Sequence, residues 1–122
     1  MDHRPEEIAI NLLEQLIAIP SFSKEEDVTA TVLEGFFKQN NIPTHRKGNN
    51  VWAINKNFNT SLPTILLNSH HDTVRPNTQY TRDPFAAVIE QEKLYGLGSN
   101  DAGGPLVSLI AAFIHFYVQQ NL

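Results

Sequence analysis

Hydrophobic residues recur three or four positions apart in three stretches of the chain, and this spacing predicts three amphipathic helices. The first stretch, residues 5–19, begins with a proline and is followed by another, which suits the first turn of a helix and the position after its end. The second follows Ser23 and Glu26, which have the spacing of a capping box, and the third opens at Pro105. The expected apolar stripes are Ile8, Leu12, Leu13, Leu16 and Ile17 in the first stretch, Val28, Val32, Leu33, Phe36 and Phe37 in the second, and Leu106, Leu109, Ile110, Phe113, Ile114 and Tyr117 in the third.

Between the second and third helices, the pattern changes to short strands separated by turn residues. Residues 64–68 are the most apolar of these strands, and their unbroken hydrophobic run predicts burial on both faces in the middle of a sheet. The strands are expected at residues 42–47, 51–55, 64–68, 87–91 and 94–95, the first two and the last two as hairpins. Two helices, a set of strands and a final helix predict an α/β fold, with helices packed on a mixed β-sheet.

The apolar strand leads directly into His70, His71 and Asp72. Because alternate side chains of a strand share a face, His70 and Asp72 would point the same way and His71 the opposite way. A metal-binding histidine usually donates its second N–H to a carboxylate, and His-x-Asp offers that pair. The structural alternative is a surface turn or a core histidine with satisfied hydrogen bonds. The position at the C-terminal end of the strand favours a site, because open α/β sheets bind ligands there.

A glycine-rich turn, residues 96–104, contains one further carboxylate, Asp101. Its glycines lack the spacing of a dinucleotide-binding fingerprint, and no phosphate-binding Gly-Lys-Ser/Thr follows. Two interpretations stay open. Asp101 could cap the helix that opens near Pro105, or the glycines could let the backbone approach a metal that Asp101 binds. One carboxylate can give one oxygen to each of two metal ions, and such a pair can hold a hydroxide.

Composition limits the ligands and partners. The 122 residues suit one domain, and the absence of cysteine leaves histidine and carboxylates as metal ligands. A net charge of −4 without a basic run argues against nucleic acid or an anionic membrane as partner. No apolar run reaches the roughly eighteen residues of a membrane span. The charged N-terminus lacks the apolar core of a signal peptide, so we expect a cytoplasmic protein.

Four pieces of sequence resemble, in their order and spacing, the N-terminal part of the di-zinc aminoacylase and carboxypeptidase family. This family includes acetylornithine deacetylase and succinyl-diaminopimelate desuccinylase. The pieces are IPSFSKEE at 19–26, LNSHHDTV at 67–74, TRDPF at 81–85 and KLYGLGSND at 93–101. The last two look most like acetylornithine deacetylase, an enzyme of arginine biosynthesis. The resemblance implies a zinc-exopeptidase-like catalytic domain, of which residues 1–122 would be the N-terminal part.

The resemblance also implies roles for individual residues. His70 would bind one of two divalent metal ions, zinc or cobalt. Asp72 would be the catalytic carboxylate that orients His70, and Asp101 would bridge both ions. A cis peptide bond is expected after Asp101. The chain departs from the family at Gly103, where the family commonly has a lysine.

The implied activity is hydrolysis of the amide bond of a small-molecule N-acyl amino acid by a metal-bridging hydroxide. The enzyme, a deacylase or metallopeptidase, would be a homodimer through a lid domain. Its general-base glutamate and remaining ligands would lie beyond residue 122. Residues 1–122 alone would be inactive, because a catalytic zinc site needs three protein ligands and a water. The alternative is a non-catalytic α/β binding or interaction module, and a Glu-Glu pair about thirty residues downstream would favour the enzyme.

Overall fold

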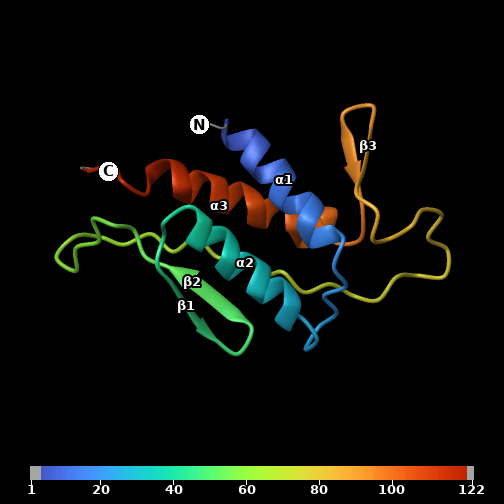
Figure 1. Cartoon of the computed structure of the whole chain (residues 1–122), viewed down its shortest axis with the longest axis horizontal. Helices are drawn as coiled ribbons and strands as arrows, with labels where there is room; N and C mark the ends of the chain where they lie inside the picture. The colour runs from blue at the N-terminus through green and yellow to red at the C-terminus, as the bar shows by residue number, and fades with distance from the viewer. Residues whose placement is uncertain (1–3, 121–122) are drawn as a thin grey trace.

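The computed structural model describes residues 4–120, in which three α-helices surround most of the core (Figure 1). The helices are α1 (Pro5–Ile17), α2 (Asp27–Gln39) and α3 (Gly104–Phe116). Helices α1 and α3, from opposite ends of the chain, lie side by side and make the most extensive contact between any two elements (Figure 1). None of the helices in residues 4–120 has the length and apolarity required to span a membrane.

The hydrophobic core lies where the three helices meet. Helix α1 contributes most, since four positions of its predicted stripe are buried and Leu12 is fully inaccessible. Complete burial of a leucine side chain contributes about 1.5–3 kcal/mol, so this stripe is a main source of stability. The buried core cluster comprises Leu12, Leu13, Leu16, Ile17, Leu33, Phe37, Ile42, Val107 and Ile110.

The start of α2 differs from the sequence prediction. The helix begins at Asp27, and its N-cap residue, Glu26, makes no side-chain capping bond. Ser23 is therefore not a cap, and the predicted capping box is wrong. The backbone N–H of Ser23 instead donates to the Thr73 carbonyl, 3.1 Å away, because residues 21–23 are paired with a distant extended segment.

The strands form two antiparallel hairpins, which confirms the α/β class. The first joins β1 (Thr44–Lys47) to β2 (Asn50–Ala53), and α2 packs on it (Figure 1). The second joins β3 (Val88–Glu90) to β4 (Lys93–Tyr95). The sequence predicted one mixed sheet. The described residues instead contain two separate antiparallel hairpins and one isolated parallel bridge.

The strand predicted at residues 64–68 is not formed. This segment joins neither sheet, and Ile65 and Leu66 are 85% and 83% exposed. A central strand needs backbone partners on both sides, and the described residues supply none at this position. The parallel bridge, between Phe22 and Thr73, comes only after the apolar run has ended. The prediction of a buried strand was therefore wrong for this structure.

Candidate metal centre

The segment His70–Thr73 is held in an extended conformation against residues 21–23. The Thr73 N–H donates to the Ser21 carbonyl at 2.8 Å, and the Ser21 hydroxyl donates to the His71 carbonyl at 2.9 Å. Alternate side chains of an extended segment point to opposite faces. His70 and Asp72 therefore share one face, and His71 lies on the other, as the sequence predicted.

Asp72 holds the imidazole of His70 from behind. The Nδ1 atom of His70 lies 3.0 Å from Oδ1 of Asp72 and 3.2 Å from the Asp72 carbonyl oxygen. Both oxygens can only accept here, so Nδ1 carries the hydrogen and Nε2 is the nitrogen left for another ligand. This is the arrangement that orients a metal-binding histidine. The His70 side chain is half exposed, so Nε2 is open to the surface.

Asp101 completes the predicted set of three residues. Its Oδ1 lies 3.1 Å from Nε2 of His70, although the residues are 31 positions apart in the chain. The Asp101 side chain is 88% exposed and lies in the turn Ser99–Gly103, which precedes α3. It does not cap α3, whose N-cap residue is Gly103 and shows no side-chain capping bond. The peptide bond after Asp101 is cis, as the family resemblance implied.

Two glycines allow this turn to pack closely, Gly98 against Thr73 and Gly103 against α1. Gly98 has a φ of +77°, and a Cβ there would lie 2.5 Å from the Thr73 side chain. A Cβ at Gly103 would lie 2.6 Å from the Leu13 side chain and 2.8 Å from the Gly98 carbonyl oxygen. At Gly103, where the resembled family commonly has lysine, the present packing accepts only glycine without a local shift.

The environment of His70 favours its protonated form. Burial of the ring is the largest single influence and lowers the pKa. The hydrogen bond to the Asp72 carboxylate, the Asp72 carbonyl, the Asp72 charge and the hydrogen bond to Asp101 act in the opposite direction. Together they outweigh burial, so the pKa of His70 is raised above its ordinary value. The imidazole lies between two carboxylates, which is an environment that also attracts a metal cation.

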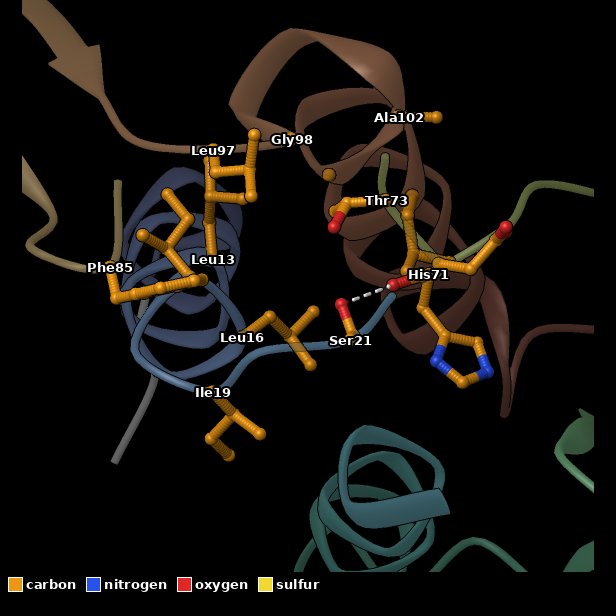
Figure 2. Close-up of a pocket in the computed structure, with 14 residues that line it drawn as sticks. Leu13, Leu16, Ile19, Ser21, His71, Thr73, Phe85, Leu97, Gly98 and Ala102 are labelled. Carbon is orange, nitrogen blue, oxygen red and sulfur yellow. Dashed lines mark hydrogen bonds between the residues drawn. The ribbon is translucent and has the colours of Figure 1, made fainter. Parts of the chain in front are cut away.

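A cleft of about 500 Å³ opens beside these residues. It is lined by His70, Asp72 and Asp101, and Tyr80 is the aromatic residue among its walls. A second, much smaller cavity of about 20 Å³ lies between α1 and the His70–Thr73 segment, with Leu13 and Leu16 on one side (Figure 2). Its size suits a single water molecule, so the open cleft is the candidate for a substrate.

The positions of His70 and Asp101 fit a shared metal ion. In a tetrahedral zinc site with bonds of about 2.0–2.1 Å, neighbouring ligand atoms lie about 3.3 Å apart. The 3.1 Å between Nε2 of His70 and Oδ1 of Asp101 is close to that separation. Among residues 4–120, no group of three or more histidine, aspartate and glutamate side chains is arranged to hold a metal ion. Within residues 4–120, the arrangement thus brings together one imidazole nitrogen and one carboxylate oxygen, with a second carboxylate on the other side of the imidazole.

Arg82, in the TRDPF piece at 81–85, contacts β3 and β4. Its guanidinium lies 3.8 Å above the Tyr95 ring and donates to the Glu90 carboxylate at 2.8 Å. The hydrogen bond and the charge of Arg82 lower the pKa of Glu90. Asp83 accepts a hydrogen bond from the Phe85 N–H within its own loop. Both side chains are therefore engaged by neighbouring residues of the chain.

The other described histidines, His45 and His115, are not among the residues that line this site. His45 stacks on Trp52 with ring centroids 5.5 Å apart. Trp52 is 45% exposed, and its strand β2 belongs to a two-stranded hairpin. His115 is exposed on α3, and His3 lies outside the described residues.

Sequence reasoning missed the residues that support the site from behind. The His71 ring contacts the Thr29 hydroxyl and the Asn49 carbonyl, and the His71 carbonyl accepts from Ser21. Strand alternation predicted that His71 turns away from the other two residues. No sequence pattern connected His71 with these partners, because Thr29 on α2 is 42 positions away and Asn49 in the β1–β2 turn is 22 positions away.

Comparison with known proteins adds to this geometry. Residues 66–121 match the family described as Peptidase family M20/M25/M40. The succinyl-diaminopimelate desuccinylase of Beijerinckia indica subsp. indica is 32% identical over 126 residues, which cover 94% of this chain and 32% of the relative. The desuccinylase of Gluconobacter oxydans is 31% identical over 116 residues, covering 88% of this chain and 29% of the relative. That of Blochmanniella floridana is 30% identical over 112 residues, covering 84% and 29%.

The chain spans about a third of the length of these curated relatives. All three relatives are desuccinylases, so the expected closer likeness to acetylornithine deacetylase and to arginine biosynthesis is not shown by them. The matched range includes His70, Asp72 and Asp101. Over residues 66–121, the chain is therefore similar to members of Peptidase family M20/M25/M40.

Proposed function

We propose that this chain forms one wall of the active site of a metal-dependent hydrolase that cleaves the amide bond of N-acyl amino acids. The observation that carries the proposal is the convergence of three side chains. Nε2 of His70 lies 3.1 Å from Oδ1 of Asp101, and Nδ1 of His70 lies 3.0 Å from Oδ1 of Asp72. A ligand pair with an orienting carboxylate behind the histidine is the arrangement such a centre requires.

Each residue has a distinct role in this proposal. His70 binds a metal ion through Nε2, and Asp72 keeps the hydrogen on Nδ1 so that Nε2 stays available. Asp101, with its highly exposed carboxylate, binds the same ion and has a second oxygen free for a neighbouring one. Zinc or cobalt bound there would supply an activated water at neutral pH and polarise the acyl carbonyl. We propose two such ions in the intact protein.

The relatives and the cleft support the proposed substrate class. The relatives carry the name of an enzyme acting on succinyl-diaminopimelate, and the sequence pieces at 81–85 and 93–101 favour acetylornithine. The walls of the cleft formed by residues 4–120 include two carboxylates and no lysine or arginine. An uncharged acetyl group needs no cation from this wall, whereas the free carboxylate of a succinyl group needs one from elsewhere. We propose acetylornithine as the substrate to test first and succinyl-diaminopimelate as its competitor.

The same proposal covers the organisation of the intact protein. Residues 1–122 would be the N-terminal part of the catalytic domain, since the alignments cover about a third of each relative. Further ligands, the general-base glutamate and a lid domain that mediates dimerisation would come from the rest of the molecule.

One observation favours a second candidate. The described residues contain no group of three or more metal ligands, so this wall alone also fits a non-catalytic α/β binding module. The two candidates differ in one property. The enzyme binds metal at His70 and Asp101 and turns over an acyl amino acid, whereas the binding module does neither.

The test uses the intact protein and two variants of the proposed ligands, His70→Ala and Asp101→Ala. After dialysis and reloading with zinc, metal content and hydrolysis of both acyl substrates are measured. We expect both variants to lose bound metal and to lose hydrolysis at least a hundredfold. His115→Ala removes an exposed histidine from α3 and is the matched control. Wild-type metal content and wild-type hydrolysis in Asp101→Ala would overturn the proposal.

A further inference from the structure

His71, between the two residues of the proposed centre, connects three separate parts of the chain. Its Nδ1 lies 2.8 Å from the hydroxyl of Thr29, which is in the first turn of α2 and almost fully buried. Its Nε2 lies 2.9 Å from the carbonyl oxygen of Asn49, in the β1–β2 turn. Its own carbonyl accepts from Ser21. Figure 2 shows the imidazole turned away from the small cavity and towards α2.

The partners of the ring determine which nitrogen carries the hydrogen. The Asn49 carbonyl only accepts, so Nε2 must donate to it. In a neutral imidazole, Nδ1 then accepts, and the Thr29 hydroxyl donates to it. The Thr29 hydroxyl also donates to the Glu26 carbonyl at 3.1 Å, and that oxygen accepts from the Ala30 N–H at 3.1 Å as well. Both ring nitrogens of His71 thus have a hydrogen-bonding partner, one on α2 and one in the β1–β2 turn.

The hydrogen bonds between His70 and Asp72 lie within one short segment and cannot set how that segment is rotated about its own axis. That rotation decides whether Nε2 of His70 faces Asp101, which lies on a different turn. The His71 side chain is on the opposite face and is held by α2 and by the hairpin. Fixing one face of an extended segment fixes the other, because neighbouring side chains point in opposite directions.

We propose that His71 is a positioning residue of the metal centre: its bonds to Thr29 and Asn49 set the rotation of the His70–Asp72 segment and so place Nε2 of His70 against Asp101. The expected effect on metal binding rests on the proposed function. The contact between His70 and Asp101 is present in the protein without metal and can be tested separately. Metal ligands held by such partners lose about 10–100-fold in affinity when the partner is removed.

The first experiment measures zinc affinity by competition with a chelating dye, and the visible spectrum of the cobalt-loaded protein. His71→Leu removes both ring hydrogen bonds at similar volume, and Thr29→Val removes only the hydroxyl. Thr29→Ser keeps the hydroxyl and is the matched control for Thr29→Val, as His115→Leu is for His71→Leu. We expect His71→Leu and Thr29→Val to bind zinc about 10–100-fold more weakly and to alter the cobalt spectrum. Thr29→Ser and His115→Leu should match the wild type.

A structural role alone would give a different pattern. It would lower the melting temperature of His71→Leu and Thr29→Val while zinc affinity and the cobalt spectrum stayed unchanged, and that result would overturn the proposal. If His71→Leu does not fold, the Thr29→Val and Thr29→Ser pair decides, since a valine is isosteric with threonine. Equal zinc affinity in that pair would also overturn it.

A second experiment separates this inference from the proposed function, because it needs no metal. NMR follows the His70 ring resonances of the metal-free protein and their response to Asp101→Asn. We expect a clear response in the wild-type background, a response lost in Thr29→Val and His71→Leu, and one retained in Thr29→Ser. An undiminished response in Thr29→Val would overturn the positioning role even if the wild type binds zinc. Failure of the wild type to bind zinc, with this pattern intact, would overturn the proposed function and leave the placement of His70 by His71 standing.

Discussion

Two apolar regions of this molecule differ in burial. In α1, the hydrophobic stripe is buried, and Leu12 is wholly inaccessible. In residues 64–69, an equally apolar run is open, with Ile65 and Leu66 more than four-fifths exposed. A helix satisfies its backbone hydrogen bonds within itself and needs only a surface to pack on, which α3 provides. A strand needs backbone partners as well, and the described residues offer it none.

The difference matters for the candidate site, which begins where the exposed run ends. Residues 64–69 belong to neither described sheet, so no sheet supports His70 and Asp72 from that side. They are held instead by the pairing of Thr73 with residues 21–23 and by the side chain of His71. The site is therefore held by residues 21–23, by α2 and by the β1–β2 turn. Residues 64–69, which precede it, have no such contacts among the described strands. The following predictions test that contrast, beginning with the largest expected effect.

Truncation of a buried leucine should have a far greater effect than truncation of an exposed isoleucine. We expect Leu12→Ala to lower the free energy of unfolding by about 2–5 kcal/mol, because it opens a cavity at a fully inaccessible position. Ile65→Ala should change it by less than about 0.5 kcal/mol. Urea denaturation of both variants measures the two values. Similar losses for the two variants would show that residues 64–69 are packed as tightly as α1.

Two glycine substitutions should have opposite signs. Gly98→Ala places a Cβ 2.5 Å from the Thr73 side chain at a φ of +77°, so we expect a loss of about 1–3 kcal/mol in the free energy of unfolding. Gly35→Ala meets no atom within 4 Å in the middle of α2. It should stabilise by about 0.5–1 kcal/mol through helix propensity. Thermal and urea unfolding check both, and a neutral Gly98→Ala would mean that the turn and Thr73 are not in close contact.

The exposed run should be visible to a hydrophobic dye. We expect residues 1–122, expressed alone, to bind such a dye and to associate at high concentration, because an exposed apolar segment without strand partners invites both. Leu66→Lys should reduce dye fluorescence and association while changing the free energy of unfolding by less than about 0.5 kcal/mol. Leu13→Lys, at a buried position of α1, is the contrasting variant and should unfold the protein. Unchanged dye binding in Leu66→Lys would contradict the exposure of this segment.

The smallest expected effect concerns pH. The pKa of His70 is raised in the folded, metal-free protein. A raised histidine pKa adds stability that is fully present below the unfolded value of about 6.5 and is lost as pH rises through the folded value. We expect Asp72→Asn to lower the pKa of His70 in an NMR titration and to flatten this decline in stability. Asp83→Asn, whose carboxylate accepts from the Phe85 N–H, is the control. An unchanged His70 titration in Asp72→Asn would rule out Asp72 as its partner.

Sequence periodicity predicted the three helices to within a few residues, because a stripe at helical spacing has one way to become buried. It could not foresee that Ser23 would pair with Thr73 instead of capping α2, since local and distant partners competed for the same backbone group. The strand at 64–68 failed for the related reason that apolarity gives no information about hydrogen-bond partners. Both errors lie at contacts between distant parts of the chain.

The candidate site was predicted in part. Strand alternation placed His70 and Asp72 on one face, and the family resemblance brought Asp101 to them, which spacing alone could not do. The structure speaks against the capping interpretation of Asp101, because its carboxylate faces His70 and α3 has no side-chain capping bond. Metal binding by Asp101 stays a prediction. The partners of His71 were beyond prediction, since a buried threonine and a turn carbonyl carry no distinguishing sequence pattern.

The packing of α1 on α3 also sets the order in which the protein can fold during its synthesis. Helix α1 ends at Ile17 and α3 ends at Phe116, so its main packing partner emerges from the ribosome about a hundred residues later. At about 5–20 residues per second, the apolar stripe of α1 waits roughly 5–20 s for that partner. During this interval, α2 and the first hairpin are already available, whereas Leu12 and its neighbours remain open to chaperones and to other nascent chains.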